Sequence, residues 1–336
     1  MDIVTQGLLG ATAALSASKQ KETRLAVGTG FVAGLLPDID ALIGSAEDPL
    51  LNIEFHRHFT HALIFIPIGG LIAALILWPF LQQRLPFKRL YLFTLLGYAT
   101  HGLLDATTSY GTQLLLPFSD ERIAWRIIAI VDPVFSFILI IAIIFGWRHR
   151  KALNARAGLL LAAGYLLFGV WQHNNAGEAT LRLAQQRGHQ VDRFLVKPTM
   201  ANQVLWRSVY ESNGVFYVDA IRLRLFSDDR IYEGGQANRF MLERDRPNLE
   251  QGSALRHDIE RFLYFSHDYV AADPDRENVL IDVRYSMLPN GLKPIWGIDM
   301  NEASSTRHAQ FVNYRDRDEF TRERFIGMVL GQTTEN

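Results

Sequence analysis

The sequence predicts an α-helical polytopic membrane domain of about six helices, followed by a soluble α+β domain. Two observations lead to this fold class. The long apolar runs lie almost entirely in residues 1–174, whereas residues 175–336 are polar and rich in Arg, Asp and Glu, so that the mean hydropathy near zero is misleading. Short runs of β-branched and aromatic residues bounded by turn signals appear only after Trp171. We therefore expect a membrane-embedded domain at residues 1–174 and a second domain at residues 175–336.

The membrane domain is predicted from segments long or apolar enough to cross a bilayer, which takes about 20 mostly apolar residues. Two weaker segments come first and are rich in Gly and Ala, residues that suit close helix packing within a bundle. The start of the chain lacks the basic leader and cleavage site of a signal peptide, so these segments are expected to be retained. The six segments are Ile3–Ala17, Leu25–Ile43, Ala62–Leu81, Leu90–Tyr110, Ile127–Trp147 and the shorter Ala157–Trp171.

Basic residues indicate the orientation of these segments. Lys and Arg gather in alternate connections, at residues 19–24, 84–89 and 148–156. By the positive-inside rule these connections are cytoplasmic, and six crossings put both termini outside. We expect a multi-pass integral protein of the cytoplasmic (inner) membrane with an extracytoplasmic C-terminal domain. Strands are predicted there at Val204–Tyr210, Val215–Leu225 and Val279–Tyr285, and helices at His257–Tyr264 and Arg317–Leu330.

Composition excludes several classes of function. The formal net charge is −1 and neither half of the chain has a strong basic excess, so nucleic acid is not an expected partner. The absence of cysteine removes disulfides, thiolate ligands and a Cys nucleophile, and any metal ligands must be His, Asp or Glu. The sequence contains no Walker loop, no dinucleotide fingerprint and no Gly-x-Ser-x-Gly elbow.

Three polar clusters lie at the outer ends of predicted membrane segments. They are Pro37–Asp40, His56–His61 and His101–Asp105. His101 and Asp105 are spaced i, i+4 and share one face of a helix. Ionisable groups inside a membrane are costly and normally face a partner in the bundle interior.

Each cluster alone also has a simpler interpretation. A neutral His bonded to a carboxylate can serve helix packing, Asp38 and Asp40 can be solvated carboxylates at a helix end, and three imidazoles can form an interfacial polar collar. Asp38 and Asp40 can serve one site only where Pro37 or the helix end bends the backbone. Thr60 is a predicted N-cap for a helix beginning at His61.

Taken together, the three clusters predict a metal site. Imidazoles and carboxylates without sulfur suit Zn²⁺, Mn²⁺ or Fe²⁺, and Asp-rich sites also admit Mg²⁺. A bound divalent metal lowers the pKa of water and so supplies a nucleophile near neutral pH. The spacing leaves one or two ions open. Arg57 is placed to pair with an anionic substrate oxygen or with an acidic neighbour.

These motifs resemble the YdjM-like family of membrane-bound (inner-membrane), metal-dependent hydrolases. The resemblance rests on Met1-Asp2-Ile3-Val4-Thr5, Gly34-Leu35-Leu36-Pro37-Asp38-Ile39-Asp40, His56-Arg57-x-x-Thr60-His61, His101-Gly102-Leu103-Leu104-Asp105 and Val131-Asp132-Pro133, with Asn202-x-x-x-Trp206-Arg207 resembling the soluble tail of many members. The resemblance implies that the metal ligands are Asp38, Asp40, His56, His61, His101 and Asp105. It also implies Asp132 as a further candidate residue of the active site. His58 falls in a variable slot and is assigned to packing. Gln6 stands where the family often has His, which makes a second metal less secure.

The predicted function is therefore a membrane-bound hydrolase with a metal-activated water. The location of the clusters at the outer edge of the bilayer favours an ester or phosphoester of a lipid or lipid-linked substrate, with the C-terminal domain capping the site or presenting the substrate. Two alternatives stay open: an ion- or proton-handling membrane transporter, and a non-catalytic binding protein with a structural metal site.

Overall fold

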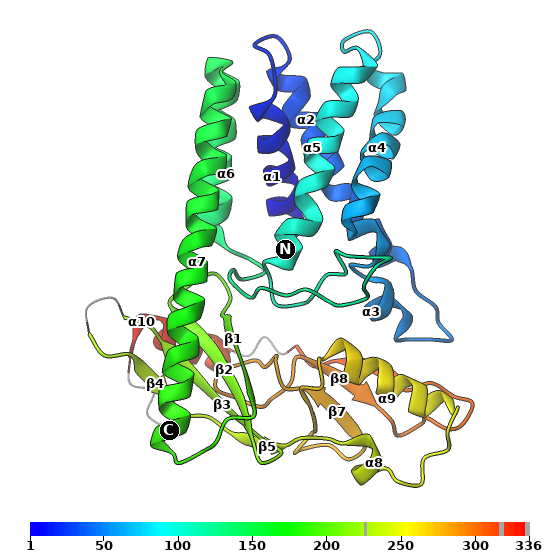
Figure 1. Ribbon diagram of the computed structural model, residues 1–336, viewed down its shortest axis with the longest axis vertical. Coiled ribbons are helices and arrows are strands. Elements are labelled where there is room, and N and C mark those ends of the chain that lie inside the picture. Colours follow the sequence, from blue (N-terminus) through cyan, green and yellow to red (C-terminus); the bar gives the residue numbers. More distant parts are fainter. Residues whose placement is uncertain (225–226, 316–318, 333–336) are drawn as a thin grey trace. The chain divides into compact units, whose positions relative to one another are not determined.

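The computed structural model describes residues 1–224, 227–315 and 319–332 (Figure 1). The chain divides into two compact units. The first unit comprises Met1–Ile43, Phe55–Trp171 and Met200–Asn202, and the second comprises Gly44–Glu54, Gln172–Thr199 and Gln203–Asn336. The division after Trp171 falls inside one long helix, α7 (Ala152–Gln186).

The first unit is helical. Its helices are α1 (Ile3–Ser16), α2 (Thr23–Leu35), α4 (Ile66–Leu81), α5 (Phe87–Ala106), α6 (Pro133–His149) and the first part of α7. Short 3₁₀ turns connect them at η1 (Leu36–Leu42), η2 (Phe59–His61) and η3 (Leu63–Phe65), and the one-turn helix α3 (Leu51–Phe55) precedes η2. Each of the six segments predicted from the sequence overlaps one of these six helices.

Glycines let three of these helices approach closely. α1 packs against α2 and α5, and α5 packs against α4 on its other side (Figure 1). A Cβ added to Gly10 of α1 or to Gly97 of α5 would lie 2.5 Å from the carbonyl oxygen of Gly30 in α2. No side chain fits at these positions, and the small residues of the first two predicted segments do serve close helix packing.

Among the described residues, three helical stretches are long and apolar enough to cross a membrane: Thr23–Leu42, Leu63–Leu81 and Ala152–Gln186. Helices α1 and α6 are apolar but shorter, at 14 and 17 residues. The predicted count of about six membrane-spanning helices is therefore not confirmed within the described residues.

Several predicted boundaries were wrong. The segment predicted at Ile127–Trp147 becomes helical only at Pro133, because Asp132 caps the helix by accepting a hydrogen bond from the Phe135 amide at 3.0 Å and proline suits the first helical position. Helix α5 ends at Ala106 rather than Tyr110, and α7 is 35 residues long and extends well past the predicted Ala157–Trp171.

Thr60 is not an N-cap, in contrast to the prediction. It lies inside η2, its hydroxyl donates to Asp40, and α4 begins only at Ile66. Its hydroxyl thus serves the polar cluster described below instead of a helix end.

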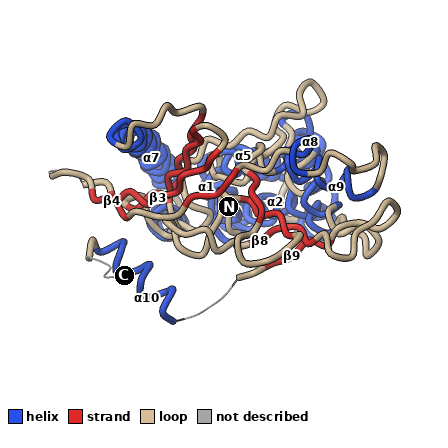
Figure 2. The backbone as a smooth tube through the Cα atoms, turned by 90° about the horizontal axis from the view of Figure 1, so that it is seen from below, coloured by secondary structure: helices blue, strands red, loops and turns tan. Residues whose placement is uncertain are grey.

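The second unit contains two antiparallel sheets. The first has the order β1–β2–β3–β4 with β5 also paired to β3, and the second has the order β6–β7–β8–β9, in which β8 and β9 run side by side (Figure 2). The strands are β1 (Arg193–Pro198), β2 (Leu205–Ser212), β3 (Val215–Arg222), β4 (Arg230–Tyr232), β5 (Gln236–Asn238), β6 (Val270–Ala272), β7 (Val279–Asp282), β8 (Trp296–Asp299) and β9 (Gln310–Asn313). Helices α8 (Leu242–Asp245), α9 (Ala254–Phe265) and α10 (Glu319–Leu330) complete this unit.

Local sequence explains the strand pairing. β2 and β3 form a hairpin whose turn residues Asn213 and Gly214 both have positive φ, as the Asn-Gly pair favours. The apolar core of this unit contains residues of both sheets: Leu195, Val209 and Phe216 from the first, and Val279 and Ile281 from the second. The strands and helices predicted from the sequence are present in this unit, although Leu225 and Arg317, two predicted element ends, lie outside the described residues.

Candidate metal centre

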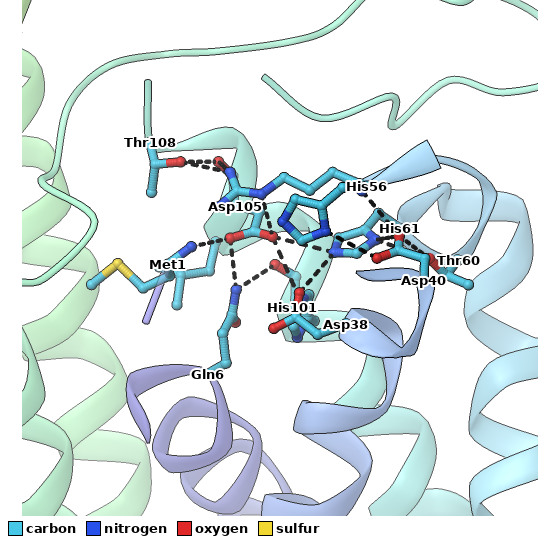
Figure 3. Close-up of polar contacts among 12 residues, drawn as sticks. Met1, Gln6, Asp38, Asp40, His56, Thr60, His61, His101, Asp105 and Thr108 are labelled. Atoms are coloured by element: carbon cyan, nitrogen blue, oxygen red, sulfur yellow. Dashed lines mark hydrogen bonds and ion pairs between the residues drawn. The ribbon is translucent and has the colours of Figure 1, made fainter. Parts of the chain in front are cut away.

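Three separate stretches of the first unit bring the predicted polar residues together (Figure 3). Asp38 and Asp40 lie in η1, where Pro37 and the 3₁₀ turn replace the regular α-helix. His61 ends η2, and His101 and Asp105 lie one turn apart near the end of α5. The predicted bend at Pro37 is what allows both carboxylates of η1 to face the same cluster.

Four side chains offer ligand atoms to one point. One atom each of Asp38, His61, His101 and Asp105 lies within 4.8 Å of the other three. Three of these residues are buried, and the side chain of Asp38 is 23% exposed.

The distances between these atoms match a metal coordination shell. His101 Nε2 lies 3.3 Å from Asp38 Oδ1 and 3.5 Å from Asp105 Oδ2. His61 Nε2 lies 3.3 Å from Asp105 Oδ2 and 3.7 Å from Asp38 Oδ1. Ligands about 2.1 Å from a tetrahedral metal are about 3.4 Å apart, so these four His–Asp pairs already have nearly this spacing.

The acceptor that faces Nδ1 of each imidazole determines its tautomer, and so which nitrogen is free to bind an ion. His101 Nδ1 lies 2.6 Å from the carbonyl oxygen of Gly34, which can only accept, so Nδ1 carries the proton. His61 Nδ1 lies 3.0 Å from Asp40 Oδ2. In the neutral form of both rings, Nε2 then presents its lone pair toward Asp38 and Asp105, as in metal-binding histidines held by an acceptor behind them.

His61 Nε2 makes no hydrogen bond with any described residue, although its side chain is fully buried. Such an atom is uncommon in a folded protein and calls for a partner. His61 lies outside the membrane-spanning segments. Burial alone lowers its pKa, but the neighbouring carboxylates of Asp105, Asp38 and Asp40 outweigh burial and raise the pKa to about 10. The surrounding carboxylates therefore favour a positive charge at this point.

Asp40 is a hub of hydrogen bonds behind the histidines. Its Oδ2 accepts from the Arg57 amide at 3.0 Å and from the Thr60 hydroxyl at 2.6 Å, and it also faces His61 Nδ1. Its Oδ1 lies 3.1 Å from His56 Nδ1. Asp38, Asp40 and His56 form a second group of atoms within 4.8 Å, which overlaps the first at Asp38.

Arg57 is locked into the same cluster. Its guanidinium Nε lies 3.2 Å from Asp105 Oδ2, Nη1 donates to Thr108 Oγ1 at 2.9 Å, and the group lies over the Tyr110 ring. Its φ of 63° is rare for a residue other than Gly and is held by the bonds of its own amide and carbonyl. The sequence left open whether Arg57 pairs with an anionic substrate or with an acidic neighbour. In the structure it pairs with the acidic neighbour Asp105.

Sequence patterns missed two groups around Asp105. The amino group of Met1 forms an ion pair with Asp105 Oδ1. Gln6 Nε2, noted in the sequence only as a lost ligand, donates to the same oxygen at 2.9 Å, and Gln6 Oε1 is buried without a hydrogen-bond partner among the described residues. Only tertiary structure places α1 beside Asp105, so no local spacing could have revealed these contacts.

The structure does not bring Asp132 into either group. Its carboxylate accepts from the Phe135 amide and from the Tyr165 hydroxyl, the latter at 2.9 Å to Oδ2. These contacts hold the start of α6 against α7. His58 packs its ring beside Phe55 and Phe59, in keeping with a packing role.

A third group of possible ligand atoms lies in the second unit, at Asp48, Asp258 and His308. The Arg261 guanidinium lies 2.9 Å from Asp48, and His308 Nδ1 lies 2.8 Å from Asp258. These oppositely charged and hydrogen-bonding partners account for the carboxylates, so this group has the character of a structural ion-pair network.

The donor set of the first group fits a divalent metal. Two imidazole nitrogens and two carboxylate oxygens without sulfur suit Zn²⁺, Mn²⁺ or Fe²⁺. The buried Asp/His cluster could therefore hold a metal ion.

Comparisons with known proteins concern the same half of the chain. The family model described as YdjM inner membrane protein matches residues 1–176. The uncharacterized protein YfhP of Bacillus subtilis (strain 168) is 28% identical over 184 residues, which cover 54% of each chain. The inner membrane protein YbcI of Escherichia coli (strain K12) is 32% identical over 111 residues, or 32% of this chain and 63% of YbcI. The matches thus span between half and two thirds of these relatives, and no solved structure matches the chain.

Proposed function

Because this chain belongs to the YdjM inner membrane protein family, we propose that it is an inner-membrane, metal-dependent hydrolase acting on an ester or phosphoester of a lipid or lipid-linked substrate. One observation carries the proposal: four ligand atoms of Asp38, His61, His101 and Asp105 converge, while the outer nitrogens of both imidazoles are held by acceptors behind them. Convergent imidazoles with carboxylates or carbonyls behind them are the usual construction of a protein metal site.

One ion fits this arrangement better than two. An ion between Asp38, Asp40 and His56 would compete with hydrogen bonds that already engage both oxygens of Asp40. We propose that Asp38, His61, His101 and Asp105 bind the ion, and that Asp40 orients His61 and His56 from behind.

A divalent ion in such a site supplies an activated water and polarises the oxygen of an ester or phosphoester. The protein side chains supply orientation and charge. Arg57 lies beside the proposed ligand atom Asp105 Oδ2, and its guanidinium offsets the charge of Asp105 and of an anionic group held beside it. His56 is 23% exposed with Nδ1 held by Asp40, so its ring is placed to exchange a proton with a substrate or with water. A catalytic role for Asp132 stays a prediction, since its present contacts are those of a helix cap.

The membrane topology is part of the proposal. Six crossings with cytoplasmic basic connections place the second unit outside the cytoplasm, where it would meet a substrate at the outer leaflet. Reporters fused after Asn336 test this orientation. Activity of a reporter that works only in the cytoplasm would contradict it.

A structural metal centre is the second candidate function of the cluster. Four protein ligands complete a tetrahedral zinc shell, whereas catalytic zinc sites keep a position for water. The partly exposed Asp38 is the ligand whose exchange would open such a position.

Elemental mass spectrometry of the purified protein tests the metal site first. The parent should retain close to one Zn, Mn or Fe per chain, and His101→Ala and Asp105→Asn should lose it. His149→Ala is a matched control, because His149 is exposed at the end of α6, stacks on the Phe145 ring and belongs to none of the His/Asp groups of the described residues. A parent that stays empty after reconstitution with each metal would remove the basis of the hydrolase.

Turnover then separates the two candidates. Lipid ester and phosphoester substrates are offered to the metal-loaded parent and to His56→Gln, which leaves the proposed ligands intact. An enzyme predicts metal-dependent turnover that falls in His56→Gln with metal content unchanged. A structural centre predicts no turnover and a loss of folded protein on chelation.

A further inference from the structure

The second unit contains a cavity that the proposed hydrolase does not use. It has a volume of about 370 Å³, and its lining includes Arg239, Arg244 and Arg246. All three lie between the end of β5 and the residue that follows α8, so a short stretch of chain supplies three arginines to the lining. The volume is within the range of pockets that hold small organic ligands.

The charge of this cavity is not balanced by its own lining. Asp245 is the only carboxylate among the lining residues, which are all described, and Arg244 holds it through Nε at 2.7 Å. The hydrogen bond from Arg244 lowers the pKa of Asp245, so this carboxylate is ionised at neutral pH. Three cations against one anion leave the lining with an excess of two positive charges.

Two of the arginines have bonding capacity to spare. Within the described part of the chain, Arg246 is engaged through Nη2 by the neutral amide oxygen of Asn278 at 2.6 Å and by no carboxylate. Arg239 reaches Glu211 with Nη1 at 3.2 Å, while its Nε is buried without a hydrogen-bond partner among the described residues. A guanidinium fork of this kind matches the oxygens of a phosphate or carboxylate.

Another part of the lining is apolar. Phe240, Val279, Leu280 and Met300 are each less than 7% exposed and contribute to the same cavity. A ligand that satisfies both parts has an anionic head and an apolar body. Inorganic phosphate would use the arginines alone.

We propose that this cavity binds a small organic phosphate, with the phosphate on Arg239, Arg244 and Arg246 and the organic part against Phe240 and Met300. The same chemistry is offered by a water-soluble phosphate ester and by the headgroup of a phospholipid. The site is separate from the Asp/His cluster and does not depend on the proposed hydrolase activity.

Calorimetric titration of the full-length protein in detergent tests the proposal. The protein is first treated with EDTA and then dialysed free of both metal and EDTA, so that a phosphate cannot be held by a metal at the Asp/His cluster and no carboxylate chelator competes for the arginines. The probes are phenyl phosphate, a short-chain phosphatidic acid and inorganic phosphate. The first two should bind more tightly than inorganic phosphate, and the tighter of them identifies the soluble or the lipid source.

Variants expected to weaken binding and a variant expected to strengthen it test whether the probe binds in this cavity. Arg246→Gln and Arg244→Gln should each weaken binding of the better probe about tenfold, because each removes a charge-assisted hydrogen bond. Asp245→Asn should strengthen it, since it removes the only negative charge of the lining. Arg307→Gln is the control: Arg307 is an exposed arginine of the same unit that pairs with Glu302 and does not line the cavity.

Absence of binding by both organic phosphates would overturn the proposal. So would binding that is equal in the parent, Arg246→Gln and Asp245→Asn, because an anion attracted elsewhere on the molecule would not respond to this lining.

Discussion

Replacing Asp40 by Asn is the sharpest test of the proposed metal centre. Asp40 receives hydrogen bonds from the Arg57 amide and the Thr60 hydroxyl, and it faces the Nδ1 atoms of His56 and His61. Asn has nearly the same size but offers one acceptor oxygen, and its NH₂ group would face a donor. At least one buried donor then loses its partner, and His61 is no longer held by a carboxylate.

The expected loss follows from the position of Asp40 behind the ligands. Changes of residues that orient metal-binding histidines typically reduce metal affinity by about 10- to 100-fold, which corresponds to about 1.4–2.8 kcal/mol. Removal of a proposed ligand, as in His101→Ala, should reduce affinity further, to the point where no metal survives dialysis. The rank order should be parent, then Asp40→Asn, then His101→Ala.

Competition with a chelator of known affinity measures these constants on protein in detergent. Asp120→Asn serves as the matched control, since Asp120 is exposed and belongs to none of the Asp/His groups. An Asp40→Asn protein that binds metal like the control would refute the orienting role. One that is as empty as His101→Ala would show that Asp40 is itself a ligand.

Three further predictions concern other parts of the chain. Gln6→Leu should weaken metal binding about tenfold without abolishing it, because Gln6 holds the Asp105 oxygen that points away from the histidines; the chelator assay measures this, and unchanged affinity would exclude the role. Gly97→Ala should lower the free energy of unfolding by about 1–3 kcal/mol, because the added Cβ would lie 2.5 Å from the Gly30 carbonyl; thermal unfolding in detergent should show a lower Tm, and an unchanged Tm would contradict the close contact. Burial raises the pKa of Asp48, but the hydrogen bond and charge of Arg261 outweigh it and hold the pKa below the ordinary value. The stabilisation by Asp48 is therefore fully present above about pH 4 and is lost as pH falls through the lowered pKa, so Asp48→Asn should lower the Tm at pH 7, and the difference from the parent should shrink as pH falls below about 4.

The part of the site that the sequence could predict is local. His101 and Asp105 were placed on one helix face by their spacing, and their facing atoms are 3.5 Å apart. The backbone bend at Pro37 was likewise predictable, since proline at a helix end disfavours a continuous regular helix. The remaining ligand candidates were assigned from their resemblance to the family motifs, which carry no information on the distances between the residues.

What the sequence could not predict depends on contacts between distant segments. The Gly34 carbonyl behind His101 is invisible in a sequence because every residue has a carbonyl. The left-handed backbone of Arg57 and the amide of Gln6 become informative only once η1, α1 and α5 are packed together. The predicted start of α6 was wrong for a related reason. Ile127 belongs to a continuous hydrophobic run, but the N-cap at Asp132 determines where the helix begins.

The wide separation of the cluster residues has a consequence for the order of events during biosynthesis. Asp38 enters the bilayer region with η1, whereas Asp105 is made 67 residues later, at the end of α5. No ion can be chelated by the nascent chain until these stretches have met. Binding of the proposed metal by all four residues would therefore be a late step that reports completed assembly of the bundle, and its binding energy would stabilise chains that have already packed correctly.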